Sequence, residues 1–266
     1  VLIEGVPGVA KTLLARLTAR LIDADFSRVQ FTPDLMPSDV LGTTVFNMKT
    51  NGFDFHQGPI FADIVLVDEI NRAPAKTQAA LFEVMEERQI SIDGTTHRMG
   101  DLYTILATQN PVEQEGTYKL PEAQLDRFLM KITMDYPSLE EEVNILERHH
   151  TNAALVKLDD IVPAITKEEL LSLRAFMNQV FVDRTLLQYI ALIVQQTRTS
   201  KAVYLGASPR ASVAMLQSSK AYALLQGRDF VTPEDIKFVA PYVLQHRLIL
   251  TAEAEMEGYS PVKVTQ

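Results

Sequence analysis

The chain carries the stretch Gly5-Val6-Pro7-Gly8-Val9-Ala10-Lys11-Thr12 close to its first residue, and this stretch decides the fold. It follows the apolar run Val1-Leu2-Ile3 and precedes a segment of helical character that begins at Leu13. An order of strand, glycine-containing loop and helix is the context that a phosphate-binding loop requires. The first amides of a helix lack intrahelical partners, and the helix dipole adds partial positive charge there. The stretch therefore predicts a nucleotide site.

The residue types of this loop suit the phosphates of a nucleotide. Lys11 supplies a mobile charge for the terminal phosphates, and Thr12 places a hydroxyl where a magnesium ion would sit. Ala10 stands at the second glycine of the usual G-x-x-x-x-G-K-[ST] pattern, although alanine disfavours positive φ. The alternative is an ordinary strand-to-helix turn with a solvated lysine. The residues expected to contact ATP or ADP are Gly5, Val6, Pro7, Gly8, Val9, Ala10, Lys11, Thr12 and Leu13.

The composition excludes several classes of site. The 266 residues fit one large or two modest domains, and the absence of cysteine excludes disulfides and thiolate metal sites. It is compatible with a reducing cytoplasm, the location that we expect. The net charge of −9 argues against a general nucleic-acid grip but not against a local basic patch. We expect no transmembrane segment, because the apolar runs are too short. The chain begins at Val1 rather than Met, and we interpret it as a fragment missing its natural N-terminus.

Residues 1–136 alternate between strand and helix patterns. The apolar run 64–67 fits a strand buried on both faces of a parallel sheet, and Asn51-Gly52 predicts a hairpin over about 44–56. A second hairpin is expected over about 89–99. The predicted core strands are 1–3, 28–31, 64–67, 103–108 and 128–134. The fold class is therefore α/β with a five-stranded parallel sheet.

Pro137 marks a change in the pattern, since helical patterns follow it and strand patterns stop. Ser138 and Glu141 form a capping box that opens an acidic helix, so 137–165 is predicted as a connecting helix and linker. The remainder, 166–266, is predicted to be a small all-α domain. Its expected helices are 167–181, 184–199, 209–226 and 233–250.

Asp68 and Glu69 end the buried strand 64–67. In open parallel sheets, ligands bind outside the carboxyl ends of the strands. Asp68 can hold the magnesium ion through water, and Glu69 can orient and activate an attacking water. The alternative is a solvated acidic pair at the end of a strand.

Three further residues are candidates for catalysis. Asn110 ends the next core strand and could hold the lytic water or the γ-phosphate, although taken by itself it is better explained by a strand-ending Asn-Pro turn. Arg127 could act from a neighbouring subunit on transition-state charge, or form a surface ion pair of little worth. Arg210 lies in the first turn of a helix, where the dipole disfavours a cation, and we favour an anion as its partner.

Together these residues resemble the AAA+ ATPases, and more closely the MoxR family. Gly5–Thr12 resembles the Walker A loop, and 65–73 resembles Walker B with the family's Asn-Arg-Ala extension. Residues 107–111 resemble the sensor 1 strand with Asn110 as the sensor, and 206–211 resemble the sensor 2 motif with Arg210. Residues 115–128 are similar to a family signature that makes Arg127 the candidate arginine finger.

The resemblance implies a three-layer α/β/α core followed by a small all-α lid. It also implies a homo-oligomeric ring, expected to be a hexamer, that binds ATP with Mg²⁺ between subunits and hydrolyses it to ADP and phosphate. In this clade the helix 2 insert (44–56) and the pre-sensor 1 hairpin (89–99) can line the central pore. Family members are chaperone-like remodellers in complex maturation and metal-cofactor insertion, often with partners that carry von Willebrand factor A domains.

Two other functions stay open at this point. A nucleic-acid motor of the same clade would need basic hairpins, and the first carries Lys49 alone while the second carries His97 and Arg98. A nucleotide-gated binding module would hold ATP without turnover, and the intact set of Glu69, Asn110 and Arg127 counts against it.

Overall fold

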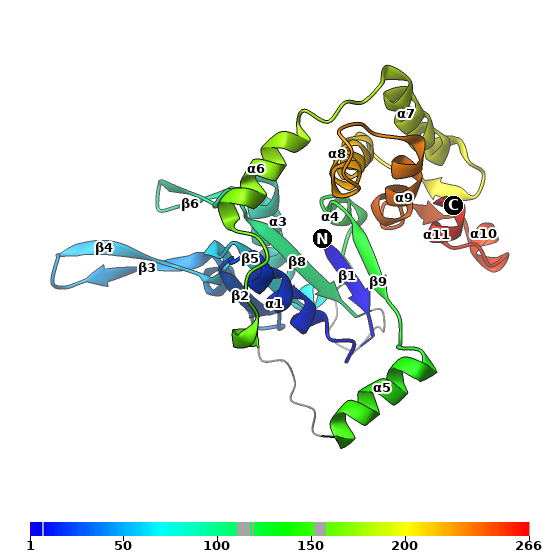
Figure 1. The fold of residues 1–266 in the computed structure, drawn as a ribbon. Helices are drawn as coiled ribbons and strands as arrows, with labels where there is room; N and C mark the ends of the chain where they lie inside the picture. The colour runs from blue at the N-terminus through cyan, green and yellow to red at the C-terminus, as the bar shows by residue number, and fades with distance from the viewer. Residues whose placement is uncertain (7, 111–117, 119, 152–157, 266) are drawn as a thin grey trace. The chain divides into compact units, whose positions relative to one another are not determined.

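The structure, a computed structural model, describes residues 1–6, 8–110, 118, 120–151 and 158–265 (Figure 1). The chain divides into two compact units. The first unit comprises Val1–Lys119 and Thr133–Leu170, and the second comprises Leu120–Ile132 and Leu171–Gln266. The domain boundaries expected after residues 136 and 165 stay predictions.

The first unit is built on a sheet of five strands in the order β2-β5-β8-β1-β9 (Figure 1). The strands are β1 (Leu2–Gly5), β2 (Phe26–Gln30), β5 (Ile64–Asp68), β8 (Thr104–Gln109) and β9 (Lys131–Met134). The pairings of β2 with β5, of β5 with β8 and of β1 with β8 are parallel. All of β5 is buried, as expected for a strand covered on both faces.

Helices cover the sheet on both faces (Figure 1). Helix α1 (Lys11–Leu21) leads from β1 to β2, whereas α3 (Ala75–Glu87) leads from β5 to β8, in the opposite direction along the strand order. Because parallel crossovers are right-handed, opposite directions place the two helices on opposite faces. The unit also contains α2 (Pro37–Leu41), α5 (Leu139–His150) and the short 3₁₀ turns η1 (Pro59–Phe61), η2 (Ile70–Arg72) and η3 (Leu158–Asp160).

Hairpins occupy both of the stretches where the sequence indicates them. The longer one, β3 (Gly42–Asn47) with β4 (Gly52–Gln57), projects from the core, and β6 (Gln89–Ile92) with β7 (Thr95–Arg98) forms the other (Figure 1). At the base of the longer hairpin, Gly42 and Gly58 lie so close that a Cβ on either would collide with the facing backbone. Near its far end Met48 is 89% exposed and Phe53 is 74% exposed.

The second unit is mainly helical. Ser208 and Thr232 cap α8 and α9, and a proline follows each cap at the first helical position. A buried ion pair joins Arg228 to Asp235, with Nη2–Oδ1 at 2.5 Å, and Asp235 is 1% exposed. The elements are α4 (Glu122–Leu125), α6 (Lys167–Met177, which begins in the first unit), α7 (Arg184–Thr199), β10 (Val203–Leu205), α8 (Pro209–Leu225), α9 (Pro233–Leu244), β11 (Ile249–Leu250), α10 (Ala252–Met256) and α11 (Pro261–Thr265).

The structure departs from several of the predicted elements. The helix expected over 167–181 ends at Met177, and Phe181 instead pairs with Phe230 in an isolated β-bridge. The helix expected over 233–250 ends at Leu244, and β11 follows and pairs with β10, so strand structure does not stop at Pro137. His246 and Arg247 come just after the end of this helix. Their buried side chains contact the backbone carbonyl oxygen of Phe128. The strand expected over 128–134 begins at Lys131, because the Phe128 amide closes the last turn of α4 instead.

The predicted fold class is confirmed, with an α/β core on a five-stranded sheet and a helical second unit. Within the described part of the chain, no helix combines the length and the apolar character needed to cross a membrane. The order of strands brings the carboxyl ends of β1, β5 and β8 to one edge of the sheet, since β8 pairs with both of the others in parallel.

Candidate active site

A pocket of about 320 Å³ opens at this edge of the sheet, within the first unit. It lies where α1 begins and where β5 and β8 end, which is the position expected for a ligand of an open parallel sheet. The lining residues are Gly8, Val9, Ala10, Lys11, Thr12, Asp68, Glu69, Thr108 and Asn110. Apart from Thr108, every one of them is a residue that the sequence singles out for ATP, magnesium or water.

The loop before α1 is curled around the ammonium group of Lys11. Lys11 Nζ donates to the carbonyl oxygens of Gly5 at 2.5 Å and Val6 at 3.3 Å. Burial lowers the pKa of Lys11, and the charges of Asp68 and Glu69 oppose that shift. The first amides of α1 lie at this pocket and lack intrahelical acceptors, which is the setting in which helix N-termini bind phosphates.

Four of the residues predicted to contact the nucleotide are not found among the residues that line the pocket. Gly5, Val6 and Leu13 are not among the lining residues, and Pro7 lies outside the described residues. A Cβ on Gly5 would lie 2.6 Å from the Met134 carbonyl oxygen, so the close approach of backbones explains this glycine. Contacts of these residues to a nucleotide stay predictions.

The loop contains one non-glycine residue in a backbone conformation that glycine favours. Ala10 has φ 56° and ψ 27°, the left-handed region, and Gly8 has φ 88° with no atom near the position of an added Cβ. An L-residue pays about 1–2 kcal/mol for a left-handed backbone. The loop thus carries strain at the position where the usual pattern has glycine.

Replacing Ala10 by glycine is expected to raise the free energy of unfolding by roughly 0.5–1 kcal/mol, because the released strain exceeds the added chain entropy. The matched variant Gly8→Ala is expected to lower it by about 1–2 kcal/mol, since its Cβ meets open space and only the backbone is penalised. Urea denaturation of both variants measures the two effects. Shifts of the same sign in both variants would contradict this account.

Asp68 is 8% exposed and is the centre of a polar cluster. Its Oδ2 accepts from Arg28 Nη2 at 2.7 Å and Nε at 3.0 Å, and from Thr12 Oγ1 at 3.5 Å. Its Oδ1 accepts from Thr108 Oγ1 at 2.5 Å, and the same hydroxyl accepts from the Glu69 amide at 3.0 Å. A carboxylate and a threonine hydroxyl side by side are hard oxygen ligands that fit Mg²⁺.

Glu69 lies next to this cluster in a strained backbone conformation, with φ 56° and ψ 52°. Its Oε2 accepts from Gln30 Nε2 and from Arg72 Nη1, both at 2.9 Å. Left-handed non-glycine residues cost of order 1–3 kcal/mol and cluster at active sites. The carboxylate is thus held in one orientation beside Asn110, which also lines the pocket.

Sequence reasoning missed the side chains that hold the two carboxylates. Arg28 and Gln30 are two residues apart on β2, and Gln30 pairs with Asp68 in the parallel register. Two residues apart on a strand share a face of the sheet. The sequence does show two polar side chains within a short predicted strand. Their role as partners of Asp68 and Glu69 follows only when β2 is known to lie beside β5.

Arg127 and Arg210 belong to the second unit and are described there on their own. Arg210 is exposed on 51% of its side chain, and its Nη1 lies 3.8 Å from Asp126 Oδ2. Arg127 directly follows Asp126 and is partly exposed. Of the two candidate arginines, Arg210 therefore has its guanidinium near the Asp126 carboxylate, and Arg127 is the next residue in the chain after Asp126.

Comparison with known proteins finds family matches in both units of the chain. Residues 1–130 match the ATPase family associated with various cellular activities (AAA), and residues 195–266 match the AAA lid domain. The protein YeaC of Bacillus subtilis is 50% identical over 97% of this chain and 80% of its own length. The chaperone MoxR1 of Mycobacterium tuberculosis is 45% identical over 98% of this chain and 70% of its own length.

A crystal structure of a proposed ATPase from Cytophaga hutchinsonii has the same fold, with a TM-score of 0.89 and 42% identity. The match covers 99% of this chain and 82% of that one. The chain belongs to the MoxR family of AAA+ ATPases.

Proposed function

We propose that this protein binds ATP with Mg²⁺ and hydrolyses it to ADP and phosphate, as the motor of a homo-oligomeric ring that remodels a protein client. The observation that carries the proposal is the convergence of Lys11, Thr12, Asp68, Glu69 and Asn110 on one pocket. Phosphoryl transfer needs positioning and charge neutralisation more than covalent chemistry, and these groups supply both.

The roles follow from the chemistry of each group. The loop amides and Lys11 bind the β- and γ-phosphates, and Thr12 and Asp68 hold the metal. When bound, the magnesium ion neutralises charge on the phosphate oxygens. Glu69 accepts a proton from the attacking water, whose oxygen bonds to the γ-phosphorus while the bond to the ADP oxygen breaks. Asn110 orients that water.

The two arginines complete the site in this proposal. Arg210 neutralises phosphate charge in its own chain, and Arg127 acts on the nucleotide of a neighbouring subunit in the ring, which we take to be a hexamer. An arginine that acts between subunits makes hydrolysis depend on assembly.

A protein client fits the exposed surface of the long hairpin better than a nucleic acid does. Its large exposed apolar side chains near the far end are Met48 and Phe53, and Lys49 is the one basic residue between β3 and β4. A relative of 45% identity is named a chaperone. We propose action in complex assembly or metal-cofactor insertion, with a von Willebrand factor A domain protein as a candidate partner and the cytoplasm as the location.

Phosphate release measured against protein concentration, with Mg²⁺ and with excess EDTA, tests the ATPase. The activity per chain is expected to rise steeply with concentration and to vanish with EDTA. Lys11→Ala is expected to lose ATP binding, whereas Lys76→Ala, at an exposed position of α3, keeps it. ATP binding without phosphate release in the assembled state would show a nucleotide-gated binding module instead. Stimulation by single-stranded DNA would favour a nucleic-acid motor.

A further inference from the structure

The guanidinium of Arg247 holds the backbone on both sides of Arg127. This side chain is 2% exposed and reaches the segment 126–129, which lies between α4 and β9. Nε donates to Asp126 Oδ1 at 2.9 Å. Nη2 donates to the carbonyl oxygens of Asp126 at 3.0 Å and Phe128 at 2.5 Å. Nη1 donates to the carbonyl oxygens of Leu129 at 3.2 Å and Val243.

This set of contacts uses the whole donor capacity of an arginine. A guanidinium has five N–H groups in a planar fork, and five acceptors surround this one. A buried charge is costly unless it is paired and fully hydrogen-bonded, and here Asp126 supplies the opposite charge. Lysine cannot reproduce the arrangement, because its three donors radiate from a single atom.

The segment is held from its amide side as well. The amides of residues 126, 127 and 128 donate to the carbonyl oxygens of Glu122, Gln124 and Leu125, respectively. His246 Nε2 lies 3.1 Å from the Phe128 carbonyl oxygen, and Gln245 Nε2 donates to the Lys131 carbonyl oxygen at 2.7 Å. The backbone that carries Arg127 is therefore fixed by α4 on one side and by residues 245–247 on the other.

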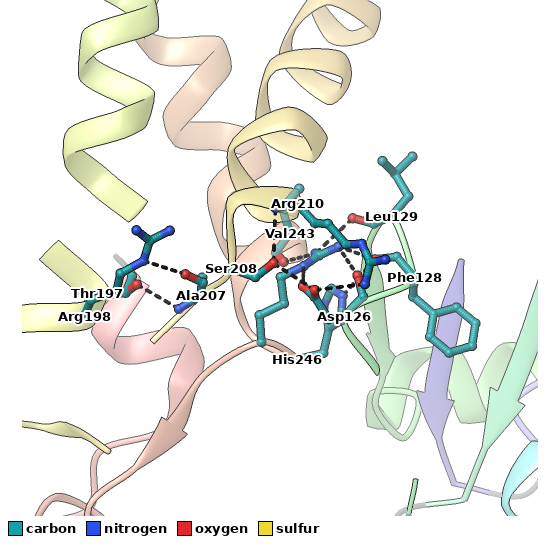
Figure 2. A network of polar contacts seen from close by, with 11 residues as sticks. Asp126, Phe128, Leu129, Thr197, Arg198, Ala207, Ser208, Arg210, Val243 and His246 are labelled. Atoms are coloured by element: carbon teal, nitrogen blue, oxygen red, sulfur yellow. Dashed lines mark hydrogen bonds and ion pairs between the residues drawn. The ribbon is translucent and has the colours of Figure 1, made fainter. Parts of the chain in front are cut away.

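The second oxygen of Asp126 joins the same segment to α8. Ser208 Oγ donates to Asp126 Oδ2 at 2.8 Å and accepts from the Arg210 amide at 3.1 Å, so one hydroxyl both caps α8 and binds Asp126 (Figure 2). The loop before Ser208 is fixed in turn, since Thr197 Oγ1 accepts from the Ala207 amide at 3.0 Å and Arg198 Nε donates to the Ala207 carbonyl oxygen at 2.9 Å (Figure 2).

We propose that Arg247 is a positioning residue for ATP hydrolysis, which fixes the segment 126–129 so that Arg127 is presented to the site of a neighbouring subunit. This inference rests on the proposed function, in which Arg127 acts between subunits. Arg247 contacts no nucleotide in this proposal, and it acts through the backbone of the segment 126–129 and the carboxylate of Asp126. Catalytic groups lose up to about 10²-fold in rate from displacements near 1 Å, so a firm backbone on both sides of an arginine finger matters.

Subunit mixing separates this role from mere stabilisation. Arg247→Lys alone is expected to lower kcat by about 10- to 100-fold with KM for ATP nearly unchanged. Mixed with Glu69→Gln, it is expected to regain activity, because its own Glu69 then works with the intact Arg127 of the Glu69→Gln neighbour. Mixed with Arg127→Ala, it should show no recovery above its own lowered kcat, since no subunit then offers a well-placed Arg127.

Arg228→Lys is the matched control, because it weakens another ion pair of the same unit, with the buried Asp235, without touching 126–129. It is expected to lower the melting temperature and to keep kcat in the folded state. If Arg247→Lys does not fold, His246→Leu serves in its place, since Arg247 still pairs the Phe128 carbonyl oxygen there. We expect the same pattern of recovery for His246→Leu with a smaller loss of kcat.

The outcomes distinguish the two proposals. Recovery of the reference mixture, Arg127→Ala with Glu69→Gln, without recovery of Arg247→Lys would overturn the positioning role alone. Recovery of Arg247→Lys by Arg127→Ala rather than by Glu69→Gln, or an unchanged kcat, would also overturn it. Failure of the reference mixture would overturn both proposals, because Arg127 would then not act between subunits.

Discussion

Replacement of Arg127 by alanine is expected to lower kcat for ATP hydrolysis by roughly 10³-fold or more, with little change in ATP affinity. An arginine finger stabilises charge that develops in the transition state, so its loss affects turnover and not ground-state binding. Steady-state phosphate release gives kcat, and titration with a fluorescent ATP analogue gives the affinity. Arg16→Ala, at an exposed position of α1, is the control and should keep full activity.

The subunit that supplies Arg127 decides how the result is interpreted. Addition of Glu69→Gln chains to Arg127→Ala chains is expected to restore part of the activity, because each variant contributes the group that the other lacks. A loss of activity in Arg127→Ala that no mixing restores would argue for a role within one chain. Full activity of the variant on its own would remove Arg127 from the mechanism.

Glu69→Gln is expected to lower kcat by about 10²- to 10⁴-fold, the usual worth of a general base. The amide has nearly the shape of the carboxylate and keeps an oxygen that can accept from Gln30 and Arg72, so the loop and the pocket should stay in place. ATP binding is therefore expected to persist, and the variant should hold ATP unhydrolysed.

Single-turnover hydrolysis of bound ATP measures this effect apart from product release. Glu83→Gln, at an exposed position of α3, is the matched control and should turn over normally. Hydrolysis by Glu69→Gln within about threefold of the wild-type rate would exclude Glu69 as the base and direct attention to Asp68, the other carboxylate of the same pocket.

The sequence was informative where local pattern and chemistry coincide. A glycine-containing loop between a strand and a helix predicts an anion site, and acidic residues after a continuous apolar run predict the carboxyl edge of a sheet. The structure brings Lys11, Asp68, Glu69 and Asn110 to one pocket, as these patterns indicate. Their catalytic roles stay proposals.

The parts that could not be predicted depend on pairings between distant segments. Arg28 can bind Asp68 only because β2 lies beside β5, and a local sequence pattern does not reveal the order of the strands. Arg247 follows a helix end and reads as an ordinary surface arginine, yet it is buried against Asp126, 121 residues earlier in the chain. Thr108 looks like one more strand residue until its hydroxyl is seen between Asp68 and the Glu69 amide.

The two ends of the long hairpin, β3 with β4, differ in how closely they are packed. Gly42 and Gly58 leave no room for side chains at its neck, whereas Met48 and Phe53 meet solvent over most of their surface. Six paired residues on each strand carry the tip about 20 Å from the neck. A substitution at Gly42 or Gly58 is therefore expected to disturb the fold of the hairpin, whereas a substitution at Met48 or Phe53 should change what the hairpin contacts and leave its fold intact.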